Sequence, residues 1–286
     1  MEFFTYYPGS FGEILQGKID DKDFLLSSPI NIYTKVRLFE CENGHMKFKN
    51  SKSNAFLINI LKSWGYENYK DNIDFEINSR ISCGKGFASS TADLCGVYHC
   101  LLKMFKRQFD ERELIEQCIK IEPTDSIIFK KMTLFDYKNG LYKRELGDYF
   151  SYNILAFEGN NIVDTLEFNN KALTNLSNVE DLLPLLREAV EERNLEKLAY
   201  VSTESIVRNQ KRLYYDFLKL VLDIKVKTSG LGIIGAHSGN VLGIVYEDYD
   251  KLSYAKNVYS NIDKCKVYSV KTLDSSNNWL GVEALQ

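Results

Sequence analysis

The stretch Cys83-Gly84-Lys85-Gly86-Phe87-Ala88-Ser89-Ser90-Thr91-Ala92-Asp93 decides how the rest of the chain is interpreted. It follows residues 73–77, which alternate apolar and polar as a half-buried strand does, and it runs into the apolar-periodic segment 94–105. The order strand, glycine-rich loop, helix brings backbone N–H groups and a helix N-terminus together, which suits a phosphate group. A plainer interpretation stays open, in which the glycines only make a tight turn and the serines only cap the helix.

The composition is that of an ordinary globular protein. The 286 residues fit one large domain or two packed ones, with 44% hydrophobic and 26% charged residues. A net charge of -3 disfavours a nucleic-acid partner, and the apolar runs are too short to cross a bilayer. The first residues lack the basic and apolar regions of a signal peptide. We therefore expect a cytoplasmic protein with no nucleic-acid or membrane partner; the oligomeric state does not follow from the sequence.

Cysteine and histidine usage argues against a zinc or redox site. The six cysteines form no C-x-x-C pair, and Cys95 and Cys100 fall on a predicted buried helix as small core residues. Only three histidines are present. A multi-histidine metal site is therefore not expected.

The order of predicted elements indicates an α+β protein rather than a strict βαβ array. In the first half we expect strands at 3–7, 24–26, 33–39 and 73–77, a turn at 8–10, helices at 55–64, 94–105 and 111–121, and a hairpin at 134–143 that turns at Asn139-Gly140. In the second half we expect strands at 152–157, 162–168, 240–246 and 265–272, a helical tract in three pieces over 181–225, and a helix near 251–260. The pattern breaks near 147, which predicts domains at 1–147 and 148–286.

Two familiar phosphate motifs fail. Gly84-Lys85 is followed by Gly86 rather than Ser or Thr, so the Walker A pattern is absent. Residues 230–235 match G-x-G-x-x-G by letter, but a helical tract precedes them and a strand follows. A dinucleotide fingerprint needs the opposite order.

Two other stretches could carry chemistry. In Ile121-Glu122-Pro123-Thr124-Asp125-Ser126, Asp125 is either an N-cap or a general base or magnesium partner with Glu122 beside it, and the bare sequence does not separate these. The loop Gly235-Ala236-His237-Ser238-Gly239-Asn240 either makes an ordinary turn or lets a ligand approach the backbone closely.

Taken together, three separated elements resemble the GHMP kinase superfamily. These are Pro8-Gly9-Ser10, the loop from Ser82 to Ala92, and the loop before the strand at 240–246. The phosphate loop of the superfamily runs Pro-x-x-x-Gly-Leu-Gly-Ser-Ser-Ala; this chain departs from it with Ser82 in place of proline and with Phe87 and Ala88 in place of Leu and Gly. The resemblance implies an N-terminal ribosomal-protein-S5-like domain and a C-terminal ferredoxin-like α/β sandwich.

Within the superfamily, the sequences of these motifs most resemble those of the branch that phosphorylates L-threonine for the aminopropanol arm of cobalamin. Pro8-x-Ser10-x-Gly12-Glu13 with Gln16-Gly17, the phosphate loop, residues 121–126 and Thr133-Leu134-Phe135-Asp136 carry this resemblance. It implies small-molecule substrates, ATP and L-threonine, with Mg²⁺ between the β- and γ-phosphates. A sister kinase acting on homoserine or another small alcohol, and a non-catalytic nucleotide-binding paralogue, stay open.

The resemblance also implies roles for individual residues. Asp125 would be the catalytic base, and Ser90 with Glu122 would hold magnesium; Glu113 and Glu116 are alternatives to Glu122. The acceptor would meet Ser10, Glu13, His237, Ser238 and Gly239. The ATP phosphates would lie over Ser82, Cys83, Gly84, Lys85, Gly86, Phe87, Ala88, Ser89, Ser90, Thr91 and Ala92.

Overall fold

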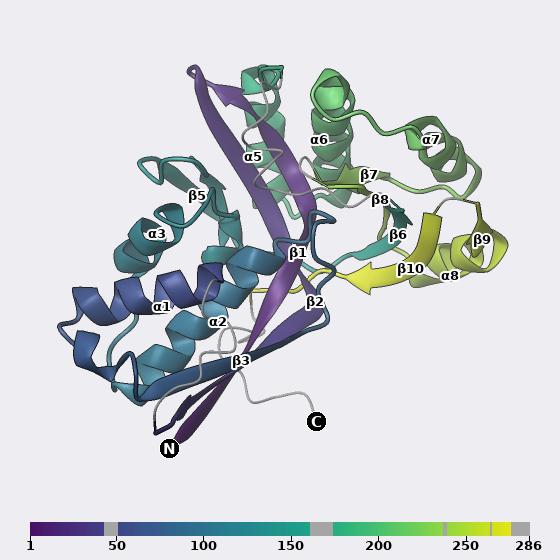
Figure 1. Ribbon diagram of the computed structural model, residues 1–286. Helices are drawn as coiled ribbons and strands as arrows, with labels where there is room; N and C mark the ends of the chain where they lie inside the picture. The colour runs from purple at the N-terminus through teal and green to yellow at the C-terminus, as the bar shows by residue number, and fades with distance from the viewer. Residues whose placement is uncertain (43–50, 161–173, 237–238, 264, 276–286) are drawn as a thin grey trace.

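The computed structural model describes residues 1–42, 51–160, 174–236, 239–263 and 265–275 (Figure 1). Its strands are β1 Glu2–Ile19, β2 Lys22–Glu40, β3 Ile73–Ser79, β4 Met132–Phe135, β5 Lys143–Gly147, β6 Asn153–Gly159, β7 Gly232–Gly235, β8 Val241–Tyr246, β9 Asn261–Ile262 and β10 Cys265–Lys271. Its α-helices are α1 Lys52–Ser63, α2 Ser89–Met104, α3 Glu111–Ile119, α5 Leu183–Glu191, α6 Leu195–Arg208, α7 Leu218–Lys227 and α8 Tyr249–Val258. The predicted α+β class is confirmed.

One sheet runs through both halves of the chain. Its order is β5-β4-β2-β1-β7-β8-β6-β10-β9, with β3 paired to β2 beside this path. The two halves meet where Glu13 of β1 pairs with Gly235 of β7. The division into domains at 147/148 therefore stays a prediction.

Two long strands, β1 and β2, form the antiparallel ribbon that crosses the middle of Figure 1. The sequence predicts a turn at Pro8-Gly9-Ser10, but β1 continues through these residues. The register of β1 against β2 shifts at Pro8/Ser10, Ser10/Glu13 and Glu13/Leu15. Bulges of this kind bend a strand and re-aim its side chains while pairing continues. Residues Pro8-Gly9-Ser10 are thus part of an irregular strand rather than a turn.

Helices cover the sheet in two groups. Figure 1 shows α1, α2 and α3 gathered beside the β1–β2 ribbon, while α6, α7 and α8 lie with the strands of the second half. Helix α5 packs on α6 and on β5. Helix α2 packs directly on β1 and β2, and α1 packs on α2. In α2, the apolar residues Leu94, Val97 and Leu101 recur at helical spacing and are fully buried. This packing anchors α2, so its N-terminus has a defined place in the site.

Several local predictions change in the folded chain. The strands expected at 24–26 and 33–39 are parts of the single strand β2, and 232–235 form strand β7 within the G-x-G-x-x-G match. After the Asn139-Gly140 turn, the return strand of the hairpin begins at Lys143 rather than at Leu141. The helical tract is confirmed in three pieces, α5, α6 and α7. The strand predicted at 162–168 lies outside the described residues.

Candidate active site

A cavity of about 370 Å³ lies where the sequence motifs converge. Such a volume is within the range of small-molecule sites. It is lined by Glu13, Gln16, Leu25, Ser51, Lys52, Ser53, Cys83, Gly84, Gly86, Phe87, Ala88, Ser89, Ser90, Thr91, Asp93, Glu122, Pro123, Thr124, Asp125, Tyr137 and Arg212. Glu13 and Gln16 of β1, the phosphate loop and the 121–126 stretch therefore share one hollow.

Helix α2 begins at the wall of this cavity without a side-chain cap. Its N-cap residue is Ala88, which adopts the left-handed conformation at φ 52° and makes no capping hydrogen bond. The serines therefore do not cap the helix, which removes the plainer interpretation of the sequence. The first-turn N–H groups and the positive end of the helix dipole are what an anionic group needs.

The phosphate loop packs closely on β1 and on residues Ala236 and Gly239 of the second half. The N–H groups of Ser10 and Gly12 donate to the carbonyls of Phe87 and Gly86, at 3.0 and 3.2 Å. Gly86 has φ +90°, and a Cβ built there would lie 2.1 Å from the Cβ of Ala236. A Cβ on Gly239 would lie 2.1 Å from the carbonyl oxygen of Lys85. Only glycine permits this approach, and the contact holds the phosphate loop in place.

Lys85 turns away from the cavity. Its side chain is buried, and its Nζ donates to the carbonyl oxygen of Gly159 at 2.6 Å. It therefore ties the loop to β6 instead of presenting its charge to a ligand. Ser82 and Ala92 also lie outside the lining of the cavity, so the phosphate contacts predicted for these three side chains have no geometric support.

Asp125 lies at the cavity wall and uses both carboxyl oxygens. Oδ1 accepts from the N–H of Ile127 at 2.9 Å, as an N-cap of the short helix Ser126–Ile128. Oδ2 accepts from the hydroxyls of Ser27 and Ser10, at 3.0 and 3.4 Å. Burial and the nearby charge of Glu13 raise the pKa of Asp125 to about 7, against the opposing effect of these hydrogen bonds. A carboxyl with such a pKa can exchange a proton near neutral pH.

One end of the cavity gathers groups of both charges. Glu13 and Gln16 of β1 are each 5% exposed, and both line the wall. Among the residues that the structure describes, the side-chain oxygen of Gln16 has no hydrogen-bond partner. The backbone of Gln16 is fixed by Ser205 and Asn209, whose side chains bond its N–H and carbonyl groups. A buried amide oxygen without a partner is costly, so this one is suited to receive a ligand donor.

Arg212 and Tyr137 complete this end. Arg212 follows the short helix Asn209–Lys211, and its Nη1 donates to the carbonyl of Thr174 at 2.9 Å. Burial raises the pKa of the Tyr137 phenol, with a further contribution from nearby acids including Glu13, while the charge of Arg212 opposes them. The positive charge of Arg212 is therefore close to the tyrosine. We call the group Glu13, Gln16, Tyr137 and Arg212 the amphoteric end of the cavity.

A second group of lining residues holds two acids and a lysine. Glu122 is 8% exposed, and its Oε2 pairs with Nζ of Lys52, the first residue of α1. Its Oε1 has no hydrogen-bond partner within the described part of the chain. Asp93 accepts from the hydroxyl of Thr34 at 2.6 Å, yet burial and the charge of Glu122 raise its pKa to about 6. We call Lys52, Ser90, Asp93 and Glu122 the acidic end.

The acidic end fits a magnesium ion that is completed by a ligand. No cluster of three or more His, Cys, Asp or Glu side chains with metal-binding geometry occurs in the described ranges. Magnesium usually takes one or two carboxylates together with phosphate oxygens and water. Glu122, which has an oxygen without a hydrogen-bond partner among the described residues, and Ser90 both line the cavity, and their oxygens are ligands of the preferred hard type.

The alternative acids Glu113 and Glu116 lie elsewhere. Glu113 accepts hydrogen bonds from the side chains of Trp64 and Tyr98, and Glu116 pairs with Arg112. Neither lines the cavity that contains Ser90. The structure thus favours Glu122 over both as the acid beside Ser90.

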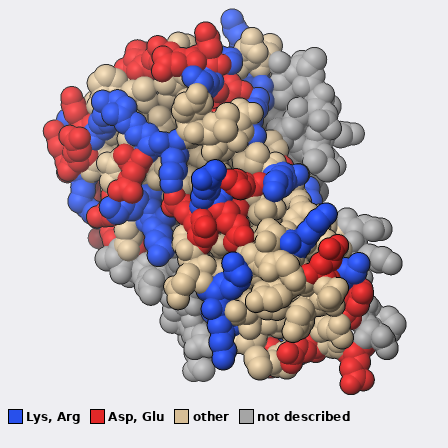
Figure 2. All heavy atoms as spheres, turned by 90° about the vertical axis from the view of Figure 1, so that its left-hand side faces the viewer, with Lys and Arg blue, Asp and Glu red and all other residues tan. Residues whose placement is uncertain are grey.

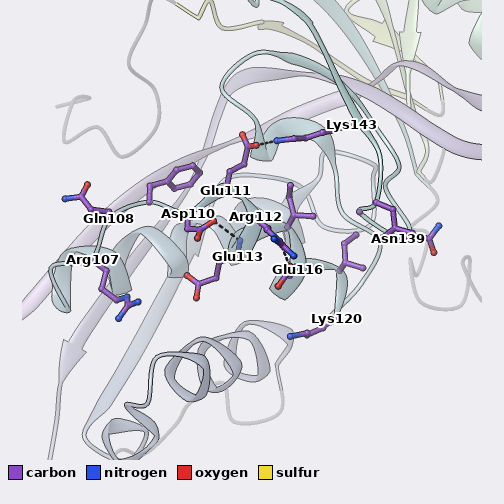
Figure 3. A pocket seen from close by; sticks show the side chains of 15 residues that line it. Arg107, Gln108, Asp110, Glu111, Arg112, Glu113, Glu116, Lys120, Asn139 and Lys143 are labelled. Carbon is purple, nitrogen blue, oxygen red and sulfur yellow. Dashed lines mark hydrogen bonds and ion pairs between the residues drawn. The ribbon is translucent and has the colours of Figure 1, made fainter.

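A larger hollow of about 1140 Å³ lies beside α3 and does not contain these motifs (Figure 3). Two ion pairs lie on its wall, Lys143 with Glu111 and Arg112 with Glu116. On the face shown in Figure 2, basic and acidic side chains also lie side by side. The motifs singled out in the sequence therefore do not meet in the larger hollow.

Other predicted acceptor residues have mixed outcomes. Ser10 is fully buried and bonded to Asp125, so it does not reach the cavity surface. Gly239 packs on the phosphate loop instead. His237 and Ser238 lie outside the described residues. Glu13 is the predicted acceptor residue that lines the cavity.

Sequence reasoning missed Lys52, Asp93, Tyr137 and Arg212 as cavity residues, and gave Gln16 no role. For Asp93 and Gln16 there was a signal, since both stand within the quoted motifs. Lys52, Tyr137 and Arg212 stand in unrelated segments. Only the tertiary structure brings them to the site.

The fold and the cavity together define a class of protein. The model of the GHMP kinases N-terminal domain matches residues 54–129. A solved homoserine kinase from Cytophaga hutchinsonii is similar with a TM-score of 0.72 at 12% identity, covering 96% of this chain and 95% of that one. The L. major mevalonate kinase solved in complex with R-mevalonate gives a TM-score of 0.69 at 12% identity, covering 96% of each chain. The resemblance to the GHMP kinases is confirmed, and the chain has their fold.

Two L-threonine kinases are more similar to this chain in sequence than the solved structures are. An L-threonine kinase of Salmonella typhimurium strain LT2 is 26% identical over 246 residues, which are 84% of this chain and 81% of that protein. An L-threonine kinase of Citrobacter freundii is 26% identical over 84% of this chain and 85% of its own length. These similarities support a small-molecule kinase. In the described ranges no helix has the length and apolarity needed to span a membrane.

Proposed function

We propose that the protein is an ATP-dependent kinase that phosphorylates the side-chain hydroxyl of L-threonine, giving O-phospho-L-threonine and ADP. The observation that carries this proposal is the arrangement of the cavity. The uncapped N-terminus of α2, the acidic end, the amphoteric end and Asp125 all line one cavity. On the resemblance of the motifs alone, we further propose that the product serves the aminopropanol arm of cobalamin.

The phosphate loop binds the nucleotide. Residues Gly84, Gly86 and Ala88 to Thr91 line the cavity, so their backbone groups and the N-terminus of α2 are available to the phosphates. Ser90 and Glu122 would hold Mg²⁺, with Asp93 nearby. When bound, the ion neutralises charge that develops on the transferred phosphoryl group.

Asp125 acts as the general base. It accepts the proton of the threonine β-hydroxyl while that oxygen bonds to the γ-phosphorus, and the bond from the γ-phosphorus to the bridging oxygen breaks as ADP leaves. Ser27 holds its Oδ2 and Ile127 its Oδ1, so the carboxyl has one orientation. The pKa of about 7 keeps the group partly ionised in the free protein and strong enough as a base.

The amphoteric end binds the amino-acid part of the acceptor. Glu13 and the amide oxygen of Gln16 accept hydrogen bonds from the ammonium group, and Arg212 pairs with the carboxylate. Buried charges need such partners, since an unpaired one is expensive. Leu25, which is 4% exposed, lies on the same wall and can contact the methyl group of threonine.

L-Homoserine is the second candidate acceptor. It has the same ammonium and carboxylate groups, and a homoserine kinase has a similar fold. The phosphate loop does not distinguish these acceptors because it binds the nucleotide.

Release of ADP is measured in parallel with L-threonine, L-homoserine, L-serine and mevalonate as acceptors. The proposal expects kcat/KM to be highest for L-threonine and lowest for mevalonate, which lacks the ammonium group. A higher kcat/KM for L-homoserine than for L-threonine would make L-homoserine the substrate in place of L-threonine. ATP binding without ADP release for any acceptor would favour a non-catalytic nucleotide-binding protein.

A further inference from the structure

Lys52 lies at the N-terminus of α1 and is the basic residue of the acidic end. Ser51 caps this helix by accepting from the N–H of Asn54 at 3.1 Å, which fixes where Lys52 leaves the backbone. The Lys52 ammonium pairs with Oε2 of Glu122. The lysine side chain is 29% exposed and the glutamate side chain 7% exposed. The pair therefore joins a partly exposed cation to a buried carboxylate.

The acids around this lysine need more positive charge than it provides. Asp93 and Glu122 line one cavity, and the charge of Glu122 contributes to the raised pKa of Asp93. The second oxygen of Glu122 has no partner among the described atoms. Removing the single cation from such a group leaves buried negative charge uncompensated. Lys52 is thus the counter-ion that makes this end tolerable in the ligand-free protein.

The lining of the cavity offers few other cations for a triphosphate. Lys85 is buried and bonded to the carbonyl of Gly159. Among the described residues that line the cavity, the cations are Lys52 and Arg212, and Arg212 lies beside Tyr137 at the amphoteric end. The phosphate side of the cavity therefore depends on Lys52 for side-chain positive charge.

We propose that Lys52 is an exchangeable counter-ion, held on Glu122 in the free protein and transferred to a nucleotide phosphate when the nucleotide binds, so that a divalent cation can take its place on Glu122. This inference rests on the proposed function, because it needs a nucleotide in the cavity. Lysine suits the exchange, since its ammonium is a point charge on a flexible four-carbon stem and keeps no fixed bidentate geometry. Lys52 is then a phosphate-binding residue that the phosphate loop itself does not supply.

The exchange predicts two effects of opposite sign for Lys52→Gln. Without nucleotide, Mn²⁺ used as the probe should bind about tenfold more tightly, because the competing ammonium is gone; tenfold corresponds to about 1.4 kcal/mol. Without metal, ATP should bind about tenfold more weakly, because the phosphate loses a cation. Calorimetry measures the ATP binding, and the electron spin resonance of free Mn²⁺ measures the metal binding. Lys62→Gln, in the last turn of the same helix and exposed, is the matched control and should change neither.

The outcomes separate this inference from the proposed function. Mn²⁺ binding that is unchanged or weaker in Lys52→Gln would overturn the exchange, as would unchanged ATP binding. A merely structural role would weaken both ligands together. Lys52→Arg keeps the charge and should restore metal-free ATP binding to within about twofold of the unmodified protein. If the unmodified protein bound no ATP, the proposed function would fail, while the Mn²⁺ measurement would still test the Lys52–Glu122 pair.

Discussion

The hydroxyl of Ser27 donates to Oδ2 of Asp125 at 3.0 Å and joins the middle of β2 to the proposed base. Ser27 is fully buried, and its own N–H donates to the hydroxyl of Ser126 at 2.8 Å. Strand β2 and the short helix after Asp125 are therefore tied together at the reacting group. The sheet, rather than a loop alone, positions the carboxylate.

Asp125→Asn should lower kcat by roughly 10²–10⁴-fold, the usual contribution of positioned proton transfer. The amide keeps the shape and can still accept from the N–H of Ile127, so ATP affinity should stay within about twofold. Single-turnover kinetics and ATP titration measure the two effects. Normal turnover in the variant would remove Asp125 from the role of base.

The rate should depend on pH through Asp125. Its pKa in the ligand-free protein is raised to about 7, and a base works when deprotonated, so kcat/KM should rise with pH through about 7 and level off above it. Ser27→Ala removes a donor to the ionised form, which raises the pKa and should shift this rise upward by roughly one pH unit. A profile of the variant that is unshifted, or shifted downward, would contradict the assignment.

The same raised pKa has an opposite consequence for the stability of the ligand-free protein. An acid whose pKa is raised in the folded state stabilises that state most at pH values below the pKa of the acid in the unfolded chain, which is near 4. This contribution is lost as the pH rises through about 7. Asp125→Asn should therefore reduce the fall in melting temperature between pH 5 and pH 8. Thermal unfolding at a series of pH values, without nucleotide, measures it; an identical fall in both proteins would argue against the shift.

Glu13→Gln should raise the KM for L-threonine more than the KM for ATP, because Glu13 lines the amphoteric end and loses its charge for the ammonium group. The expected increase for threonine is on the order of tenfold or more, as for the loss of a charged hydrogen bond. Steady-state kinetics with each substrate varied separately provide the test. A larger effect on ATP would move Glu13 out of the acceptor site.

Arg212→Met should abolish discrimination between L-threonine and L-threoninamide, which lacks the carboxylate charge. The unmodified protein should prefer threonine by roughly tenfold or more in kcat/KM, the value of a charge-assisted contact. Comparing both acceptors in both proteins isolates the contact from any general loss of activity. A preference that survives in Arg212→Met would place the carboxylate elsewhere.

Gly86→Ala should destabilise the protein by more than about 1 kcal/mol and weaken ATP binding. The new Cβ would be 2.1 Å from that of Ala236, and φ +90° is unfavourable for alanine. Adding Ala236→Gly removes the clash but not the backbone strain, so the double variant should recover part of the lost stability. Denaturant unfolding checks both variants, and no recovery would argue against this packing of the loops.

Much of the fold could be predicted because local patterns determine it. The strand before the phosphate loop, helix α2 and the helices α5, α6 and α7 follow from apolar periodicity. The turn expected at Pro8-Gly9-Ser10 was wrong because the pairing of β1 with β2 continues past a bulge, which local propensity does not reveal. The orientation of the Lys85 side chain could not be predicted either, because its hydrogen-bond partner is the carbonyl of Gly159, 74 residues further along the chain.

The sequence by itself determined the order strand, glycine-rich loop and helix, and with it the expectation of a phosphate site at residues 83–93. It also placed Glu13, Glu122 and Asp125 in motifs with defined spacing. Only the tertiary structure decided which charges share the cavity: Lys52 on Glu122, Arg212 beside Tyr137, and Lys85 turned away. The physical reason is range. Helix and turn preferences act over a few residues, whereas burial and ion pairing depend on segments that meet only when the sheet has formed.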